Sequence, residues 1–279
     1  MEQVSERAKR IAEEIIRRTN TVHYRLILDE QRQPEMTGSK IGGKPYWPAD
    51  KEYPVDALGK PMLMVMQINC SQLGLKAPLP EHGLLQWFIS LDPQRMYGCR
   101  GNFDSDGSGC RVIYHETIDD NAAPASFPTH ETVDEMFTPV KREVAIDVVQ
   151  EQTAMGVSDG HFNRLFFDIV KTITGVEHTA GEMWYEYLDN DDCLYLEQQL
   201  GMKRPRHQML GFPAFDQDDA RNDLQTQDTL LFQLASQFST TDRKELVMWG
   251  DMGNGFVFIN HEDLAARDFS RIYYCWDCG

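Results

Sequence analysis

Two glutamines occupy unexpected places in the chain, because each interrupts an apolar run. Gln67 lies in LMVMQIN and Gln233 in TLLFQLA, and both runs are typical of buried strands. A buried amide loses free energy unless its carbonyl and its NH2 group both find partners. Each glutamine therefore either holds the backbone of a neighbouring loop or turns its polar head toward a cleft, and its hydrogen-bond partners distinguish the two.

Two loops could present aromatic rings to a ligand. The motif GGKPYWP spans residues 42–48 and contains Tyr46 and Trp47, whereas LGFPAF spans residues 210–215 and contains Phe212. Proline fixes φ and glycine permits close backbone approach, so rings on such loops are ordered at a small entropic cost. The alternative is that Trp47 caps the core and that the motif only closes a loop.

His207 is the histidine with the most suggestive neighbours, since it stands beside Gln208 and shortly before the second aromatic loop. It is either a hydrogen-bonded structural residue or an acid–base group that works with nearby carboxylates. The chain has no Walker phosphate loop, no His-Glu-x-x-His helix and no Gly-x-Gly-x-x-Gly turn, and we expect no Gly-x-Ser-x-Gly nucleophile elbow. We therefore expect no catalytic residues and no cofactor, and the enzymatic alternative is a hydrolase that uses His207.

Two further motifs have only part of the pattern that a binding or redox site requires. The loop from Asn102 to Gly109 alternates oxygen-bearing side chains as a calcium loop does, but the closing glutamate is missing. Cys275 and Cys278 have the spacing of a redox pair, but they end an expected strand and have no helix N-terminus to stabilise a thiolate. We therefore expect a polar turn, ordinary thiols and no metal site.

The charge and composition exclude several classes of partner. The chain has 44 acidic and 27 basic side chains and a formal net charge of -17, which would repel the phosphate backbone of nucleic acids. No apolar run has membrane-spanning length, the first residues lack a signal-peptide core, and six irregularly spaced cysteines suit a reducing compartment. We expect a cytoplasmic protein whose acidic surface either maintains solubility or favours a cationic partner.

Helical and strand patterns both occur, and the expected fold class is α+β. It should contain mostly antiparallel sheets from two pseudo-repeated halves, with helices packed outside. Helical periodicity covers residues 4–16, 161–173, part of 181–200, and 262–267. Asn260 followed by Asp263 resembles the N-cap of the last of these helices. Strand patterns cover residues 22–29, 62–67, 83–92, 111–116, 228–236, 253–260 and 271–276, and the second to fourth of these suggest an antiparallel meander.

The last third of the chain repeats the order of features in the first third. In both, a Gly-Pro loop precedes a glutamine-bearing strand, and a strand opened by glycine follows. We expect an internal duplication within a single domain of residues 1–279, with halves at about residues 21–150 and 200–279 joined by a helical middle segment. A pseudo-twofold axis could then bring both aromatic loops to one cleft.

Five segments in order carry a resemblance to a known family: GGKPYWP, MVMQINCSQL, LPEHGLLQWFIS, HQMLGFPAFDQDD and HEDLAARDFSRIYY. Together they resemble the YwqG-like family, bacterial proteins classed as a domain of unknown function. The resemblance covers nearly the whole chain. It implies a soluble bacterial protein whose biochemical activity is not established, and it adds no catalytic residues.

These patterns favour a non-enzymatic binding or interaction protein. It would recognise a small polar ligand or a partner protein through aromatic loops and an acidic surface. The candidate ligand-binding residues are Tyr46, Trp47, Gln67, His207, Phe212 and Gln233.

Overall fold

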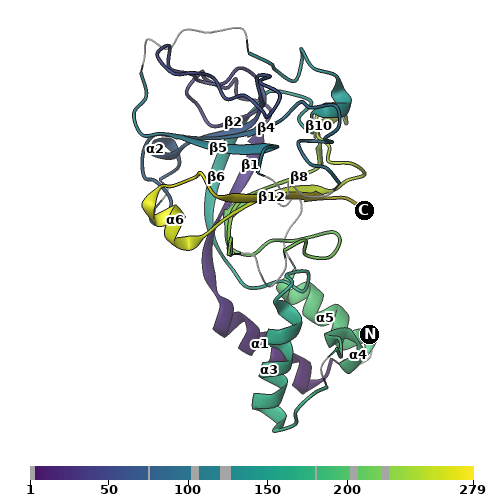
Figure 1. Cartoon of the computed structure of the whole chain (residues 1–279). Helices are drawn as coiled ribbons and strands as arrows, with labels where there is room; N and C mark the ends of the chain where they lie inside the picture. The colour runs from purple at the N-terminus through teal and green to yellow at the C-terminus, as the bar shows by residue number, and fades with distance from the viewer. Residues whose placement is uncertain are drawn as a thin grey trace.

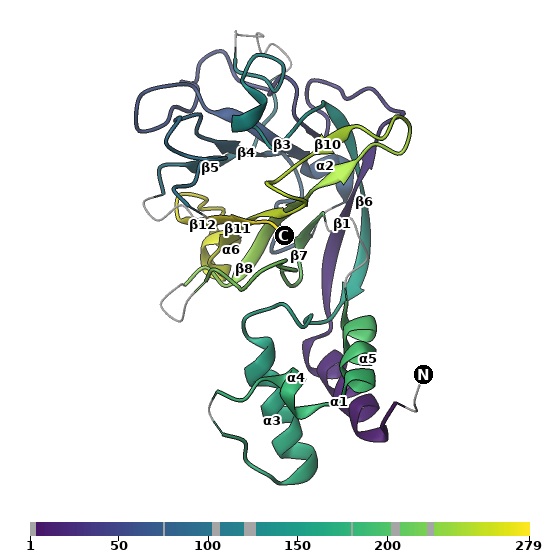
Figure 2. The same ribbon diagram turned by 90° about the vertical axis from the view of Figure 1, so that its right-hand side faces the viewer.

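A mixed architecture of helices and antiparallel strands agrees with the expected α+β class. The structure is a computed structural model, and it describes residues 4–74, 76–101, 107–119, 127–179, 181–201, 207–221 and 226–279. Figures 1 and 2 show two parts, a large sheet region and a smaller group of helices at one end of it.

Among the described residues, ten strands form one sheet in the order β12-β11-β8-β7-β1-β6-β2-β3-β4-β5, and β9 and β10 form a separate pair. Every recorded pairing is antiparallel. The bounds are β1 Thr21–Asp29, β2 Lys40–Ile41, β3 Leu63–Asn69, β4 Leu84–Ile89, β5 Cys110–His115, β6 Val144–Thr153, β7 Gln208–Leu210, β8 Thr229–Ala235, β9 Gln237–Phe238, β10 Glu245–Val247, β11 Asn254–Ile259 and β12 Ile272–Asp277.

The sheet is strongly curved, so that its two edge strands, β5 and β12, contact each other. Trp87 of β4 stacks on Phe232 of β8, with ring centroids 6.1 Å apart, and on Trp249, at 5.7 Å. Five strands separate β4 from β8 in the sheet order, so this contact requires the curvature. The main hydrophobic core is therefore enclosed by the sheet and shared by both ends of it.

Most of the helices form a layer of their own. Helices α1 (Glu6–Thr19), α3 (Phe162–Thr174), α4 (Trp184–Tyr187) and α5 (Asn190–Leu200) pack on one another around Ile11, Phe162 and Phe166, which are buried. This helical layer lies at the end of the long β1–β6 pair, away from the rest of the sheet (Figures 1 and 2).

The expectation of helices packed outside the sheets is thus met only in part. The short α2 (Cys70–Leu73) and α6 (His261–Ala266) lie beside the sheet, and α6 contributes Leu264 to the main core. The other four helices form their own core because the apolar stripe of α1 and that of α3 face each other.

The expected meander is confirmed, since β3, β4 and β5 are consecutive antiparallel neighbours. The N-cap expected at Asn260 is also present, because its side chain accepts a hydrogen bond from Glu262 N–H. Strand β6 was not expected. Its sequence, VAIDVVQEQT, becomes polar in its second half because that half leaves the main core and extends toward the helical layer.

Within the described ranges, none of the helices combines the length and the apolar character that crossing a lipid bilayer requires.

Candidate functional site

The first buried glutamine holds the backbone of the loops around it. Gln67 Oε1 accepts a hydrogen bond from Tyr46 N–H at 3.0 Å, and Gln67 Nε2 donates to Gly38 O at 2.8 Å and to Met36 O at 3.0 Å. The neighbouring Gln86 donates from Nε2 to Tyr46 O at 2.8 Å. Both backbone groups of Tyr46 are therefore bound by buried amides.

The second glutamine does the same for the second aromatic loop. Gln233 Oε1 accepts from Ala214 N–H at 3.1 Å, and Gln233 Nε2 donates to Ala214 O at 3.4 Å. Gln208, opposite Gln233 in the sheet, donates from Nε2 to Phe212 O at 2.6 Å. The partners of both glutamines confirm the loop-holding interpretation.

The aromatic rings of the first loop lie inside the protein. Trp47 is 6% exposed, packs edge-to-face on Phe88, and donates its indole N–H to Lys51 O at 2.9 Å. Tyr46 is fully buried, and its hydroxyl oxygen accepts from Asp119 N–H. Trp47 thus belongs to the core, which is the alternative to a solvent-facing platform.

Of the six candidate residues, Phe212 alone is half-buried and the others are buried. Ligand binding by these residues stays a prediction.

His207 is held as a neutral structural residue. Its Nδ1 accepts from Ala235 N–H at 2.9 Å, so Nε2 carries the proton and donates to Gln237 Oε1 at 2.7 Å. Burial lowers the pKa of His207 to about 4. No carboxylate among the described residues bonds to it. The geometry expected of an acid–base histidine is absent at this position.

A histidine–carboxylate pair lies elsewhere, in the loop between β6 and α3. His161 Nδ1 is 3.1 Å from Asp159 Oδ1, and this hydrogen bond raises the pKa of His161. The same loop contains Gly156-Val157-Ser158-Asp159-Gly160, a Gly-x-Ser-x-Gly spacing that could have drawn attention to it from the sequence. Ser158 makes no hydrogen bond to His161 or to any other described residue.

This loop is joined to the sheet by an ion pair. Asp159, His161 and Asp219 place ligand atoms within 4.8 Å of one another, a spacing that a metal ion could bridge. Arg221 already supplies the positive charge, since its Nη2 lies 2.6 Å from Asp219 Oδ2 and 3.5 Å from Asp159 Oδ2. Its guanidinium also stacks over Phe258, 4.3 Å from the ring centroid. The cluster therefore ties the loop to β11.

A small pocket of about 240 Å³ opens beside the GGKPYWP loop. The side chain of Lys40 lines it although it is only 3% exposed, and its Nζ donates to Glu143 Oε1 at 2.8 Å. His130 also lines the pocket, accepts from Gly43 N–H on Nδ1, and has its pKa lowered by burial. The residues that line this Lys40 pocket are Pro34, Met36, Lys40, Gly43, Lys44, Thr129, His130, Glu131 and Glu143.

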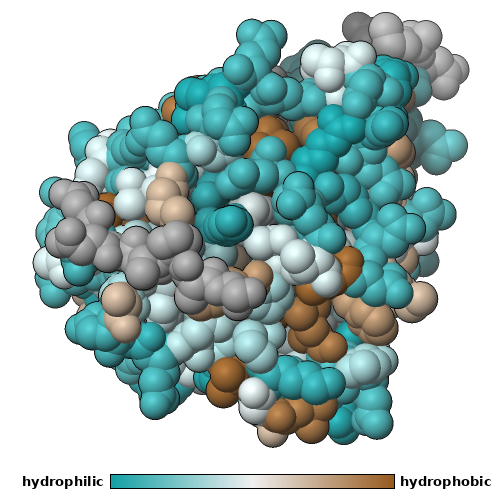
Figure 3. Space-filling model, turned by 90° about the horizontal axis from the view of Figure 1, so that it is seen from above, coloured by the Kyte–Doolittle hydropathy of each residue, from teal (hydrophilic) through white to brown (hydrophobic). Residues whose placement is uncertain are grey.

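The close approach of Gly43 to Glu143 fixes one wall of this pocket. A Cβ atom on Gly43 would lie 2.0 Å from Glu143 Oε1, and the φ of +69° is in the region that glycine favours. Glycine is therefore needed here to leave the Lys40–Glu143 pair in place. Figure 3 views the end of the molecule opposite the helical layer, and this face is largely hydrophilic with small apolar patches.

Cys275, the first cysteine of the pair with redox spacing, does not have an activated thiol. Cys275 is buried and its pKa is raised, first by burial and then by nearby carboxylates, which is the opposite of an activated thiolate. Cys278 is half-buried, and both cysteines are free. The calcium-like residues 102–106 lie outside the described residues.

Comparison with protein families identifies the class of the chain. Residues 39–278 match the family described as Domain of unknown function (DUF1963). The chain therefore belongs to this family, and the expected membership of a domain-of-unknown-function family is confirmed at that level. A comparison with curated proteins finds no match.

Replacing Trp47 with alanine should cost about 3 to 5 kcal/mol in the free energy of unfolding, because it removes a buried ring and leaves a cavity. Urea denaturation measures this cost. Tyr185→Ala is the control, since Tyr185 is 53% exposed and should cost little. A loss below about 1 kcal/mol for Trp47→Ala would contradict the core role.

Histidine burial should make the protein less stable in mild acid. The folded-state pKa of His207 is below its unfolded value, so stability is full above pH 6.5 and falls as the pH drops toward 4. Between pH 7.5 and pH 5, His207 alone should account for a loss of about 2 kcal/mol.

His207→Asn retains an acceptor for Ala235 N–H and removes this titration, so its unfolding free energy should fall less between the two pH values. His261→Asn, at an exposed site, is the control. An unchanged pH dependence in His207→Asn would show that His207 does not titrate in this way.

Proposed function

We propose that this protein is a non-enzymatic binding protein that takes a small polar ligand in the pocket beside the GGKPYWP loop. The observation that carries the proposal is the buried ammonium group of Lys40. It has three N–H donors, and among the described residues only Glu143 accepts from it. Because buried donors normally find partners, oxygen atoms of a ligand would complement the remaining two.

The charges around the pocket favour a neutral or zwitterionic ligand. Lys40 and Lys44 bring two positive charges, and Glu131 and Glu143 bring two negative ones. His130 adds no charge at neutral pH because burial lowers its pKa. The volume of about 240 Å³ is smaller than that of pockets for drug-sized molecules, so the ligand would be small.

In this proposal the buried residues act by shaping the binding loop. Gln67 holds the backbone of Tyr46, and Trp47 anchors the loop in the core. A loop that is already ordered binds with a smaller entropic cost than a mobile one. His207, Phe212 and Gln233 would act in the same way for the second loop.

We also propose an internal duplication within one domain of residues 1–279, with halves at about 21–150 and 200–279. The strand order supports it, since β2-β3-β4-β5 and β7-β8-β11-β12 flank the central β1–β6 pair in mirrored order. In each half the glutamine carbonyl accepts from the residue that follows a loop proline, Pro45 or Pro213.

Two further pairs of contacts support the duplication. Ser39 Oγ accepts from Asn69 N–H at the end of β3, and His207 Nδ1 accepts from Ala235 N–H at the end of β8. If the two halves are equivalent, His207 takes the place of Ser39 and accepts the same kind of backbone hydrogen bond. This favours a structural role for His207 over acid–base chemistry.

The second pair concerns the loop glycines. A Cβ on Gly43 would clash with Glu143, which is the hydrogen-bond partner of Lys40. A Cβ on Gly211 would lie 2.9 Å from Cβ of His23, which is the hydrogen-bond partner of Gln208. Each glycine thus lies against the partner of a residue in the neighbouring strand, β2 or β7.

We further propose a cytoplasmic, bacterial protein of the YwqG-like type with an acidic surface and no affinity for nucleic acid. The six free cysteines and the net charge of -17 support the compartment and the lack of nucleic-acid binding.

Lys40→Met should remove ligand binding while leaving the fold intact, because the substitution keeps the aliphatic volume and removes the ammonium. The measurement is a thermal-shift screen against amino acids, sugars and hydroxy acids. A compound that raises the melting temperature of the wild type should have no effect on Lys40→Met and its full effect on Lys60→Met, a lysine exposed elsewhere. Stabilisation that persists in Lys40→Met would refute this site.

The enzymatic alternative is a hydrolase, and the loop containing Ser158 is a better place for it than His207. We nevertheless expect no serine-dependent hydrolysis, because Ser158 is not bonded to His161. The measurement compares wild type and Ser158→Ala on p-nitrophenyl acetate, and the two should give equal rates. A rate that falls about a hundredfold in Ser158→Ala would establish a nucleophile and overturn the non-enzymatic proposal.

A further inference from the structure

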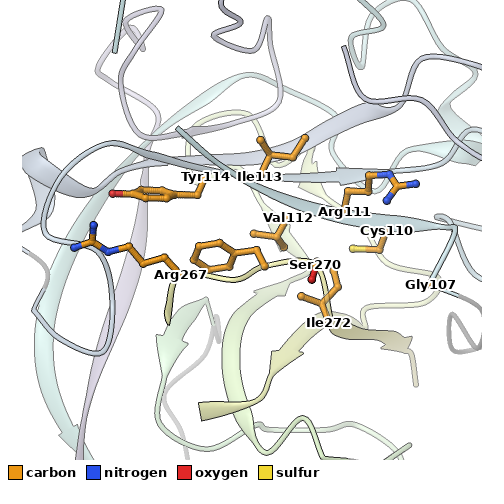
Figure 4. A pocket seen from close by; sticks show the side chains of 10 residues that line it. Gly107, Cys110, Arg111, Val112, Ile113, Tyr114, Arg267, Ser270 and Ile272 are labelled. Carbon is orange, nitrogen blue, oxygen red and sulfur yellow. The ribbon is translucent and has the colours of Figure 1, made fainter. Parts of the chain in front are cut away.

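A groove separates the edge strand β5 from the segment that leads into β12. Its volume is about 400 Å³, which is larger than that of the Lys40 pocket. Figure 4 shows residues 110–114 of β5 along one side and Arg267, Ser270 and Ile272 along the other. Tyr114 and Phe269, with ring centroids 5.9 Å apart, face each other across one end of it.

The backbone of β5 has hydrogen-bonding groups that point into this groove. Ser90 N–H donates to Gly109 O, so Ser90 and Gly109 are a hydrogen-bonded pair. Because such pairs alternate along antiparallel strands, Arg111 and Ile113 are the next residues that bond to β4. The N–H and C=O groups of Val112 and Tyr114 consequently point away from β4, toward the open edge.

The opposite side has the same arrangement at the start of β12. Ser236 N–H donates to Gly253 O, so the backbone groups of Gly253 and Gly255 point toward β8. The backbone groups of the alternate residues of β11 therefore point toward β12. Ile272 lies opposite a residue of β11 that does not bond to β12, so the N–H and C=O groups of Ile272 point away from β11. Within the described ranges no backbone hydrogen bond joins Val112 or Tyr114 to Ile272 or to residues 267–271.

The side chains around the groove are apolar in the middle and basic at the ends. Val112, Phe269 and Ile272 line it, Arg267 stands at one end and Arg111 at the other (Figure 4). Arg111 is exposed and forms no ion pair with a described residue, and Arg267 is 3.2 Å from Glu116. The ends of the groove are therefore basic, although the chain as a whole has a net charge of -17.

We propose that this groove binds an extended, acidic segment of a partner polypeptide, which pairs with the open edge of β5 as an added strand. The backbone groups of Val112 and Tyr114 would supply the pairing, and the apolar middle of the groove would take alternate side chains of the segment. Carboxylates of the segment would bind Arg111 and Arg267. The five residues from 110 to 114 span about 16 Å, which suits a segment of about five residues.

This site is separate from the Lys40 pocket, and its occupant is a polypeptide rather than a small molecule. The probe is a fluorescein-labelled eight-residue peptide of alternating glutamate and valine, and fluorescence anisotropy measures its binding. We expect saturable binding that weakens about tenfold or more when lysine replaces glutamate in the peptide, and likewise when alternate peptide amides are N-methylated.

Two variants locate the binding on the protein. Arg111→Glu combined with Arg267→Glu should weaken binding about tenfold or more, because charge attraction becomes repulsion. Val112→Pro should do the same, since it removes one outward N–H and leaves the β4 pairing intact. Arg17→Glu, in the helical layer, is the matched control and should bind as the wild type does. Lys40→Met should also bind normally, so failure of this proposal and failure of the small-ligand proposal are distinguishable.

The proposal is overturned if the peptide does not bind, or if binding is the same in Val112→Pro and in the double arginine variant as in the wild type. Sedimentation velocity tests the competing occupant. A concentration-dependent dimer that Val112→Pro abolishes would show that the edge of β5 pairs with a second copy of this chain, and this outcome would also overturn the proposal.

Discussion

The rest of the structure depends on the hydrogen bonding of two buried amides, Gln67 and Gln233. Each lies in a strand buried on both faces, where an unpaired polar group costs about 1 to 3 kcal/mol. Both amides find their partners in the backbone of a loop that would otherwise be left unpaired inside the protein. The same bonds therefore satisfy the glutamine and fix the loop, and the wall of the Lys40 pocket is built on that fixed loop.

The long β1–β6 pair determines how the main core and the core of the helical layer are related. One half of the pair lies in the curved sheet and the other extends to the helical layer (Figure 2). A second connection comes from Arg221, which joins Asp159 in the loop before α3 to Phe258 in β11. The helical layer is thus attached to the sheet through strands on one side and through a charge cluster on the other.

Much of the fold follows from local sequence patterns, whereas the site does not. The helix of residues 4–16, the meander and the cap at Asn260 are encoded by spacing and residue type within short windows, and they are present. Strand β6 was missed because its pattern changes where it leaves the core. Lys40 was missed for another reason: a lysine is normally exposed, and its burial depends on Glu143, more than a hundred residues away. Gly43 gave a signal, but the sequence could not show which side chain approaches it.

Trp87 of β4 stacks on Trp249, which lies between β10 and β11, and this contact in the main core should give an optical signal. The two indoles lie 5.7 Å apart at an interplanar angle of 15°, and they are contributed by segments far apart in the chain. Transition dipoles at this separation couple strongly, so the native protein should carry an exciton signature in circular dichroism that neither indole has by itself. Loss of that signature would report the separation of Trp87 from Trp249 in the main core, while the helical layer, whose indole Trp184 lies in a different core, still keeps its own spectrum. The chain thus contains an intrinsic optical label for the core that the sheet encloses.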